Sequence, residues 1–279
     1  MLDKLKFEAF MEGKRMKIAI VTGASSGMGR EFVMQLSRYV QVDEIWAIAR
    51  REDALKSLNP GVKVRAVSLD LLDEASFERF AALLKEEQPD VKLLVNAAGF
   101  GKFGTYHKIP VEEECRMIDL NCKALVMMTR LVLPYMKQGS HVLQLDSLSA
   151  FQPVPYLTTY GATKSFVLSY SRGMSRELKP MGIRMMAMNP GWVKTEFFNH
   201  AMQTNADAEV QYFNPLWEAE DVVATGLRDL YKSKKDYSVH GFSIRMQVRL
   251  VKLLPHSIVM DIWLKQQKKA KNNTGLTTK

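Results

Sequence analysis

The chain has 279 residues, 47% hydrophobic and 25% charged, a composition that excludes a disordered protein and supplies ample material for a core. The net charge of +9 is confined to one end: residues 228–279 hold 12 Lys and Arg against 3 Asp, whereas residues 1–227 hold 27 basic and 27 acidic residues. A neutral body without a basic, base-stacking face makes nucleic acid an unexpected partner.

The sequence shows no sign of export or of membrane insertion. Residues 1–16 carry scattered charges and no apolar core of a signal peptide, and no apolar run is long enough to span a bilayer. The two cysteines, Cys115 and Cys122, are too few for a disulfide framework. We therefore expect a soluble, cytoplasmic protein.

Apolar runs typical of strands alternate along the chain with stretches of helical periodicity. Strands are predicted at residues 16–21, 44–49, 62–69, 91–96, 141–146 and 183–189, and helices at 27–40, 74–87, 112–136 and 159–178. The strands are apolar on both faces, as expected where helices cover a sheet from both sides. The order predicts one α/β domain over residues 1–279, with a doubly wound, mostly parallel sheet between two helical layers.

The last part of the chain is predicted as a strand at 237–242 followed by helices at 245–254 and 256–271, so that residues 242–279 form a basic helical tail. In the second helix Ile258, Val259, Ile262 and Trp263 share one face. Such a face usually covers the core or a subunit interface, which is the interpretation we favour. Peripheral contact with an anionic membrane surface is the alternative.

A glycine-rich segment, TGASSGMG at residues 22–29, directly follows the first predicted strand. Glycine lets the backbone turn sharply and approach a ligand closely, and the free N–H groups of a helix start bind anions. The spacing of Gly23, Gly27 and Gly29 differs from the usual G-x-G-x-x-G dinucleotide fingerprint. The segment predicts a phosphate cradle, while a purely structural turn remains the alternative.

Further motifs follow in a fixed order: NAAG at 96–99, Asn121 inside the long helix, Ser147 after the fifth strand, Tyr160 and Lys164 as Y-x-x-x-K, and NPGWVKT at 189–195. With the glycines, this ordered set resembles the short-chain dehydrogenase/reductase family in its single-domain form, across residues 22–195. The resemblance implies a Rossmann-like fold and hydride transfer between a nicotinamide cofactor and a carbonyl or alcohol carbon.

Tyr160 and Lys164 lie four residues apart, so a helix places them on one face. A neighbouring ammonium group lowers the pKa of a tyrosine and makes proton exchange feasible. Ser147 can donate a hydrogen bond to a substrate oxygen as charge develops on it, and Ser149 is its rival two residues on. The resemblance assigns the same catalytic roles to Ser147, Tyr160 and Lys164, and gives Asn121 the positioning of a water in a proton relay.

The resemblance also implies the residues that bind the cofactor. They are Gly23, Ser25, Ser26, Gly27, Met28 and Gly29; Arg50 and Arg51; Asp70 and Leu71; Asn96, Ala97, Ala98 and Gly99; Tyr160 and Lys164; and Pro190, Gly191, Val193 and Thr195. Within this set Asp70 is expected to meet the adenine amino group, and Val193 and Thr195 the carboxamide.

NADP(H) is the expected form of the cofactor, with NAD(H) as the alternative. Proteins of this fold that prefer NAD place a carboxylate about 20 residues past the glycines, and this chain has Arg50 and Arg51 there. A guanidinium binds a 2′-phosphate and stacks on adenine. A second basic signal, before Gly27, is absent because that position is Ser26.

The segments 149–159 and 192–217 are rich in aromatic residues and proline, which favours an apolar ketone or secondary alcohol as substrate. Hydroxysteroid-like substrates, other hydrophobic carbonyls and 3-oxoacyl groups all fit, and a non-catalytic NADP sensor is the alternative of another class. His107, His141 and His200 stand alone, so no metal site is expected. The family resemblance implies a homodimer or homotetramer.

Overall fold

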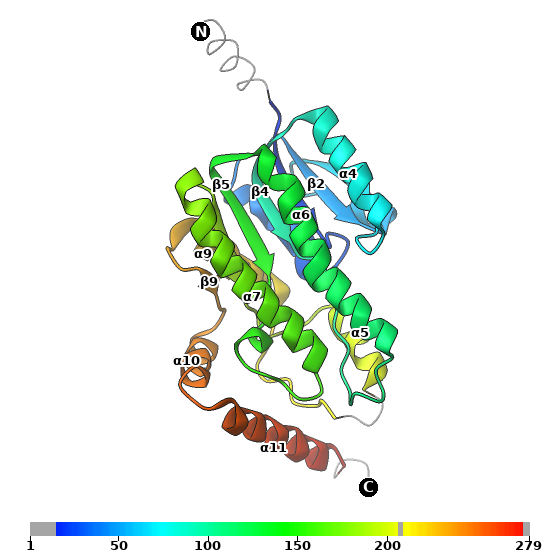
Figure 1. Cartoon of the computed structure of the whole chain (residues 1–279), viewed down its shortest axis with the longest axis vertical. Helices are drawn as coiled ribbons and strands as arrows, with labels where there is room; N and C mark the ends of the chain where they lie inside the picture. Colours follow the sequence, from blue (N-terminus) through cyan, green and yellow to red (C-terminus); the bar gives the residue numbers. More distant parts are fainter. Residues whose placement is uncertain (1–14, 206–208, 276–279) are drawn as a thin grey trace, which may run out of the picture.

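The computed structural model describes residues 15–205 and 209–275, and it is built around a seven-stranded sheet (Figure 1). The strands are β1 (Lys17–Thr22), β2 (Glu44–Ala49), β3 (Lys63–Ser68), β4 (Asp90–Asn96), β5 (Met136–Leu145), β6 (Arg184–Met188) and β9 (Tyr237–Ser238). They lie in the order β3-β2-β1-β4-β5-β6-β9, and every neighbouring pair is parallel. The strand order reverses between β1 and β4, which marks the topological switch point.

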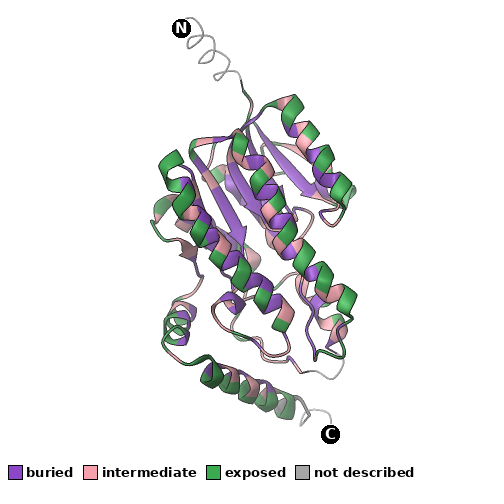
Figure 2. Ribbon diagram, in the orientation of Figure 1, coloured by how far each residue is buried: buried purple, intermediate pink, exposed green. Residues whose placement is uncertain are grey.

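Alternate side chains of each strand face opposite sides of the sheet, and both sides are covered by helices (Figure 2). Ala19 and Val21 belong to one core cluster with α2 (Gly27–Gln35) and α9 (Ala219–Lys232). Ile18 and Ile20 belong to another, with α4 (Glu74–Glu87), α6 (Leu125–Val132) and α7 (Thr158–Leu178). The predicted α/β doubly wound, Rossmann-like fold is therefore confirmed.

The remaining elements are short or lie near the end of the chain. They are α3 (Glu52–Lys56), α5 (Val111–Ile118), α8 (Phe197–Ala201), α10 (Phe242–Val251) and α11 (His256–Gly275), with a separate two-stranded sheet of β7 (Trp192–Val193) and β8 (Leu216–Trp217). The sequence analysis did not predict α9, although its Val222, Val223, Leu227 and Leu230 recur on one helical face and are fully buried.

The helix predicted at 112–136 runs without a break from Val111 to Val132, but it is not α-helical throughout. A π-helical turn at Asp119–Ala124 separates α5 from α6, and a 3₁₀ turn at Leu133–Tyr135 follows. Pro134 lies in that last turn and cannot continue an α-helix, so β5 begins at Met136 rather than at the predicted residue 141. The strand predicted at 237–242 is also shorter, because Gly241 adopts φ +84° and α10 begins directly after it.

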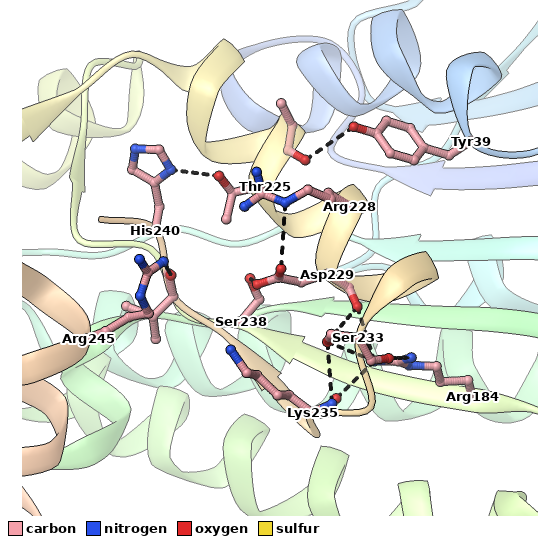
Figure 3. A network of polar contacts seen from close by, with 12 residues as sticks. Tyr39, Arg184, Thr225, Arg228, Asp229, Ser233, Lys235, Ser238, His240 and Arg245 are labelled. Atoms are coloured by element: carbon pink, nitrogen blue, oxygen red, sulfur yellow. Dashed lines mark hydrogen bonds and ion pairs between the residues drawn. The ribbon is translucent and has the colours of Figure 1, made fainter. Parts of the chain in front are cut away.

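A polar network fastens the end of α9 to the last two strands of the sheet (Figure 3). The Arg184 guanidinium donates to the carbonyl oxygens of Asp229 at 3.1 Å and Lys235 at 3.0 Å, and also to that of Ser233. The Ser238 hydroxyl donates to the Asp229 carboxylate at 2.7 Å. These bonds join β6 and β9 to α9 and so fix the point from which α10 leaves the sheet.

The two C-terminal helices lie beyond the carboxyl ends of the strands (Figure 1). On α10, Ile244 and Val248 are buried against residues that follow β5 and around β9. On α11, Val259 and Trp263 are buried, and the indole N–H of Trp263 donates to the carbonyl of Pro155 at 3.0 Å. The tail is thus packed onto the body of the molecule.

Within residues 15–205 and 209–275, none of the helices is long and apolar enough to cross a membrane, and no three His, Cys, Asp or Glu side chains are grouped so that they could hold a metal ion. Cys115 is exposed and Cys122 half-buried, and both are free thiols.

His141 supplies a test of the packing between α9 and the sheet. Its ring lies 4.3 Å from that of Tyr231, centroid to centroid, and burial, together with Arg184, lowers the pKa of His141 to about 4. The unfolded chain takes up this proton near pH 6.5 and the folded chain only near pH 4, so stability falls as pH drops through that window. The loss amounts to about 2 kcal/mol after allowance for partial exposure.

We expect the melting temperature of His141→Phe to fall less than that of the wild type between pH 7 and pH 4.5, by about 4 °C in scanning calorimetry. The control is His256→Phe, which replaces an exposed histidine at the start of α11 and should follow the wild type. If the melting temperatures of all three proteins fell equally between pH 7 and pH 4.5, the assignment of this pH dependence to His141 would be contradicted.

Candidate active site

The glycine-rich turn joins β1 to α2 and leaves no room for a side chain at Gly23 or Gly29. Gly23 has φ +68°, and a Cβ there would lie 2.8 Å from the backbone nitrogen of Ala98. A Cβ on Gly29 would lie 2.1 Å from the carbonyl oxygen of Gly23. Ser26 precedes α2 and makes no side-chain capping bond, so the first N–H groups of this helix are left for an anion.

Thr22 holds this turn against the loop that follows β4. Its hydroxyl accepts hydrogen bonds from the backbone N–H groups of Ala97 at 3.0 Å and Ala98 at 3.1 Å, and its side chain is buried. The contact lies between β1 and β4, where the strand order reverses. Ligands of open α/β sheets bind in the crevice at such a point.

A cavity of about 850 Å³ opens at the carboxyl ends of the strands. Twenty of the predicted site residues line it: Gly23, Ser25, Ser26, Gly27, Met28, Gly29, Arg50, Arg51, Asp70, Leu71, Ala97, Ala98, Gly99, Ser147, Tyr160, Lys164, Pro190, Gly191, Val193 and Thr195. Asn96 and Asn121 are the two that do not. The fold therefore gathers residues far apart in the sequence around one cavity.

Asn96 lies beneath the cavity rather than at its wall. Its side-chain amide donates to Thr129 Oγ1 and to Gln144 Oε1, both at 3.0 Å, and is buried. Asn96 is therefore not among the residues that line the cavity, and its predicted contact with the cofactor stays a prediction. As the last residue of β4 it points toward α6, and its amide joins β4, β5 and α6.

Asn121 is buried inside the π-helical turn. Its amide group exchanges two hydrogen bonds with the backbone of Phe100, at 2.9 and 3.0 Å, and donates a third to Thr163 Oγ1 at 3.0 Å. A Cβ on Gly99 would meet its Oδ1 at 2.9 Å. Asn121 thus holds the loop after β4 against α7, next to the cavity.

Ser147, Tyr160 and Lys164 meet at the floor of the cavity. Ser147 follows β5 by two residues, and its hydroxyl is hydrogen-bonded to the Tyr160 phenol and accepts from the backbone N–H of Ser149. Lys164 lies one turn after Tyr160 on α7, with its Nζ 5.7 Å from the centre of the tyrosine ring. The contact with the phenol favours Ser147 over Ser149 as the hydroxyl of the cluster.

Comparison with known proteins agrees with this geometry. Residues 17–206 match the family model for short chain dehydrogenases. The NADP-dependent 3-hydroxy acid dehydrogenase YdfG of Escherichia coli is 34% identical over 210 residues, which cover 71% of this chain and 82% of that protein. The chain belongs to the short-chain dehydrogenase/reductase family. It is therefore an oxidoreductase that acts on CH–OH groups with a nicotinamide cofactor.

Solved structures share the fold of this dehydrogenase. A short-chain dehydrogenase from Sphingobium yanoikuyae in complex with NADPH superposes with a TM-score of 0.73 at 24% identity, covering 88% of this chain and 96% of that one. A family member from Burkholderia phymatum in complex with NAD gives a TM-score of 0.74 at 21% identity, covering 85% and 92%.

Burial dominates the electrostatics of Tyr160. It raises the pKa of the phenol, the hydrogen bond with Ser147 opposes this, and the negative charge of Asp146 adds to it. The expectation that Lys164 lowers this pKa is not what the structure shows. The Lys164 side chain donates instead to the carbonyl of Leu145 at 2.8 Å and lies beside Asp146.

Asp146 is a buried carboxylate of the dehydrogenase site that the sequence analysis missed. It directly precedes Ser147 and lines the cavity, and its Oδ2 accepts from the Asn189 amide at 2.5 Å. Burial raises the pKa of Asp146 well above its usual value, while the Lys164 ammonium acts against this. An acidic residue at the end of the apolar run HVLQLD was the available signal.

The two arginines after β2 stand at the far end of the cavity. Arg51 pairs with Glu196 at 3.1 Å and lies within 3.4 Å of the Ser25 hydroxyl. Arg50 is exposed and lines the cavity beside it. Asp70 folds back on its own loop, where its Oδ1 accepts from the backbone N–H of Leu72 at 3.0 Å.

Apolar side chains dominate the other end of the cavity, beyond Tyr160. They come from the loop after β5, from the segment around β7 and α8, and from the two C-terminal helices. The residues are Leu148, Phe151, Val154, Leu157, Trp192, Phe197, Phe198, Tyr212, Pro215, Ile244, Val248, Leu250, Val251, Leu254, Val259, Ile262 and Trp263. The tail of the dehydrogenase therefore forms part of the cavity wall, a role that the sequence did not reveal.

The sequence analysis also did not predict the charged side chains at the apolar end of the cavity. Lys102 lines the cavity and is buried, with its Nζ 2.7 Å from Gln203 Oε1, 3.2 Å from the carbonyl of His200 and 3.8 Å from the Glu113 carboxylate. Arg116 lines the cavity as well and pairs with Glu113. The apolar wall is thus bordered by a charge cluster whose groups are already paired.

Thr22 offers a test of the joint between the glycine-rich turn and the loop after β4. Thr22→Val removes the hydroxyl but keeps the shape, and it leaves two backbone N–H groups without their acceptor. We expect the free energy of unfolding to fall by about 2 kcal/mol in urea titration. Thr22→Ser retains the hydroxyl and should lose less, so equal losses in the two variants would contradict this role.

Proposed function

We propose that the dehydrogenase transfers hydride between NADP(H) and an apolar ketone or secondary alcohol. The observation that carries the proposal is the meeting of the Ser147 hydroxyl, the Tyr160 phenol and a long apolar wall in one cavity. A hydroxysteroid or another hydrophobic carbonyl compound fits that wall. The apolar side chains would bind such a substrate by removing its surface from water.

The residues present fit a dinucleotide. The glycine-rich turn, where a Cβ at Gly23 or Gly29 would collide with backbone, is a cradle for close approach of a pyrophosphate. In this proposal Val193 and Thr195 hold the carboxamide end and Lys164 the nicotinamide ribose. When bound, the nicotinamide supplies the hydride chemistry.

The chain's own residues handle the proton and the substrate oxygen. Ser147 donates a hydrogen bond to that oxygen, which stabilises the negative charge that develops there during reduction. Tyr160 gives its phenolic proton to the same oxygen, as the general acid of the reduction. Lys164 is proposed to return a proton to Tyr160 through a water molecule that Asn121 positions.

The preference for NADP(H) over NAD(H) rests on Arg50 and Arg51. Both line the cavity at the point where a carboxylate would favour NAD. The E. coli relative is named as NADP-dependent and the Sphingobium protein is in complex with NADPH, whereas the Burkholderia protein is in complex with NAD. The relatives support NADP(H) without excluding NAD(H).

A second candidate substrate class is a 3-hydroxy acid, and Lys102 is the observation that favours it. This buried ammonium lines the cavity, and the relative from E. coli is named for such a substrate. Lys102 already has Gln203, His200 and Glu113 as partners, so a substrate carboxylate would have to displace them. We therefore rank the apolar substrate first, ahead of 3-oxoacyl groups and of an NADP sensor without turnover.

The proposal extends to the domain organisation, the oligomeric state and the cellular compartment of the dehydrogenase. Residues 1–279 are proposed to form one nucleotide-binding domain with residues 242–279 as its tail, and the dehydrogenase to act in the cytoplasm as a homodimer or homotetramer. The two free cysteines suit a reducing compartment.

The first test follows absorbance at 340 nm with NADPH and a panel of steroid, aromatic and acyl ketones and 3-oxo acids. Tyr160→Phe should lower kcat by about 10² to 10⁴-fold while NADPH binding is retained, because only the proton donor is lost. The matched control is Tyr170→Phe, a tyrosine on the same helix outside the cavity, which should retain activity. NADPH binding without turnover on any compound would favour the sensor.

The second test compares the two cofactors. Arg50→Ala with Arg51→Ala should raise KM for NADPH by at least about ten-fold and leave KM for NADH within about two-fold, because only NADPH carries the 2′-phosphate. Lys56→Ala removes a nearby exposed positive charge outside the cavity and serves as the control. Equal rises in both KM values would refute the assignment.

A further inference from the structure

Helix α10 has two apolar faces, of which the fold uses one. Ile244 and Val248 point into the molecule and are buried. Phe242, Met246 and Leu250 recur at every fourth residue on the opposite side and are 73%, 44% and 57% exposed. Leu253, just after the helix, extends this row and is 81% exposed.

Helix α11 continues the same pattern. Val259 and Trp263 are buried, whereas Ile258 and Ile262 are each 46% exposed. The apolar face expected from the sequence is therefore divided between the core and the outside. Six of the thirteen large apolar side chains that are exposed among the described residues lie within residues 242–262, and we call these six the outer apolar row.

Positive charge accompanies the outer apolar row. Residues 242–271 hold seven basic residues, Arg245, Arg249, Lys252, Lys265, Lys268, Lys269 and Lys271, against the single acidic residue Asp261, a net charge of +6. Arg249, Lys265, Lys268 and Lys269 are exposed on the two helices. Apolar side chains flanked by lysine and arginine are the pattern of helices that lie in the interface of an anionic bilayer.

The mouth of the cavity opens in the same place. Leu250 of α10 and Ile262 of α11 both line the cavity, and both are about half exposed to the outside. Residues that face the cavity and the solvent at once mark its rim. Leu250 and Ile262 therefore connect the apolar part of the cavity lining to the outer apolar row.

We propose that α10 and α11 bind the surface of an anionic phospholipid bilayer through the outer apolar row, with the cavity mouth against the lipid. Phe242, Leu253 and Ile258 insert among the acyl chains, and the exposed lysines and arginines meet the headgroups. No described helix can cross a membrane, so the contact is interfacial. An apolar substrate dissolved in the bilayer then reaches the cavity without passing through water; this last step rests on the proposed function, whereas the binding does not.

Charge argues against a second copy of the chain as the occupant of this face. A twofold interface brings the same patch of both subunits together. Two helical segments would then face one another, each with a net charge of +6 after its single Asp is counted. The repulsion between like charges opposes such an association, whereas an anionic lipid surface complements the positive charge of the two helices.

The test uses the full chain in a flotation assay with vesicles of phosphatidylcholine alone or with 30% phosphatidylglycerol. We expect at least about ten-fold stronger partitioning to the anionic vesicles, weakened by 0.5 M NaCl. Phe242→Ser with Leu253→Ser should reduce it at least about ten-fold, and neither residue lines the cavity. Lys265→Gln with Lys268→Gln and Lys269→Gln should reduce it on anionic vesicles only.

The matched control is Val111→Ser with Met181→Ser, which removes two apolar side chains, 63% and 55% exposed, from other surfaces. Wild-type binding by the Phe242/Leu253 variant, or no binding by the wild type, would overturn the proposal. So would a change from dimer to monomer in that variant without vesicle binding, because it would assign the face to a second copy.

Turnover of a water-soluble ketone by the same preparations separates the two proposals. Retained turnover in the Phe242/Leu253 variant shows that it is folded, so its loss of flotation reports on lipid contact. Flotation of a wild type that turns over no ketone would remove the proposed function and leave the lipid contact standing.

Discussion

The site depends on one close approach, between the end of β1 and the loop after β4. Gly23 lies so near the backbone of Ala97 and Ala98 that no side chain fits between them, and the Thr22 hydroxyl binds both N–H groups across the gap. The two strands are neighbours at the switch point, so their carboxyl ends diverge immediately beyond this contact. The cavity begins where they part. The glycine-rich turn and the NAAG loop are thus two halves of one wall.

The opposite wall is built by parts of the chain that follow the sheet. The network around Arg184 and Asp229 fixes the last strand to α9, and only three residues separate that strand from α10. Trp263 then ties α11 to the loop after β5. The substrate end of the cavity is therefore shaped by a segment whose position depends on contacts far from the chemistry. Changes in the tail can alter substrate choice without touching Ser147 or Tyr160.

The sequence was sufficient wherever a local pattern carries the structure. The order of apolar runs predicted the doubly wound sheet, and the site residues predicted from the glycine, Y-x-x-x-K and NAAG motifs all line the cavity except Asn96. The misses have physical causes. The π-turn around Asn121 leaves no mark in hydrophobic periodicity, and the burial of Asp146 and Lys102 depends on neighbours distant in the chain. The inward orientation of the Asn96 side chain is fixed by its hydrogen bonds to Thr129 and Gln144. No sequence motif connects these two residues to Asn96. Helix α9 is a different case, because its apolar residues recur at helical spacing and this pattern was sufficient to predict the helix.

The uneven charge of the chain has a consequence for how the molecule meets other surfaces. Residues 1–227 are neutral and the whole excess of +9 follows them, with α10 and α11 at one extremity of the molecule (Figure 1). This uneven distribution of charge gives the molecule a large permanent dipole moment. In the field of any negatively charged surface the molecule experiences a torque before it makes contact, and it arrives with the tail leading. Encounters would be oriented rather than random, and the cavity mouth would face the surface from the first collision.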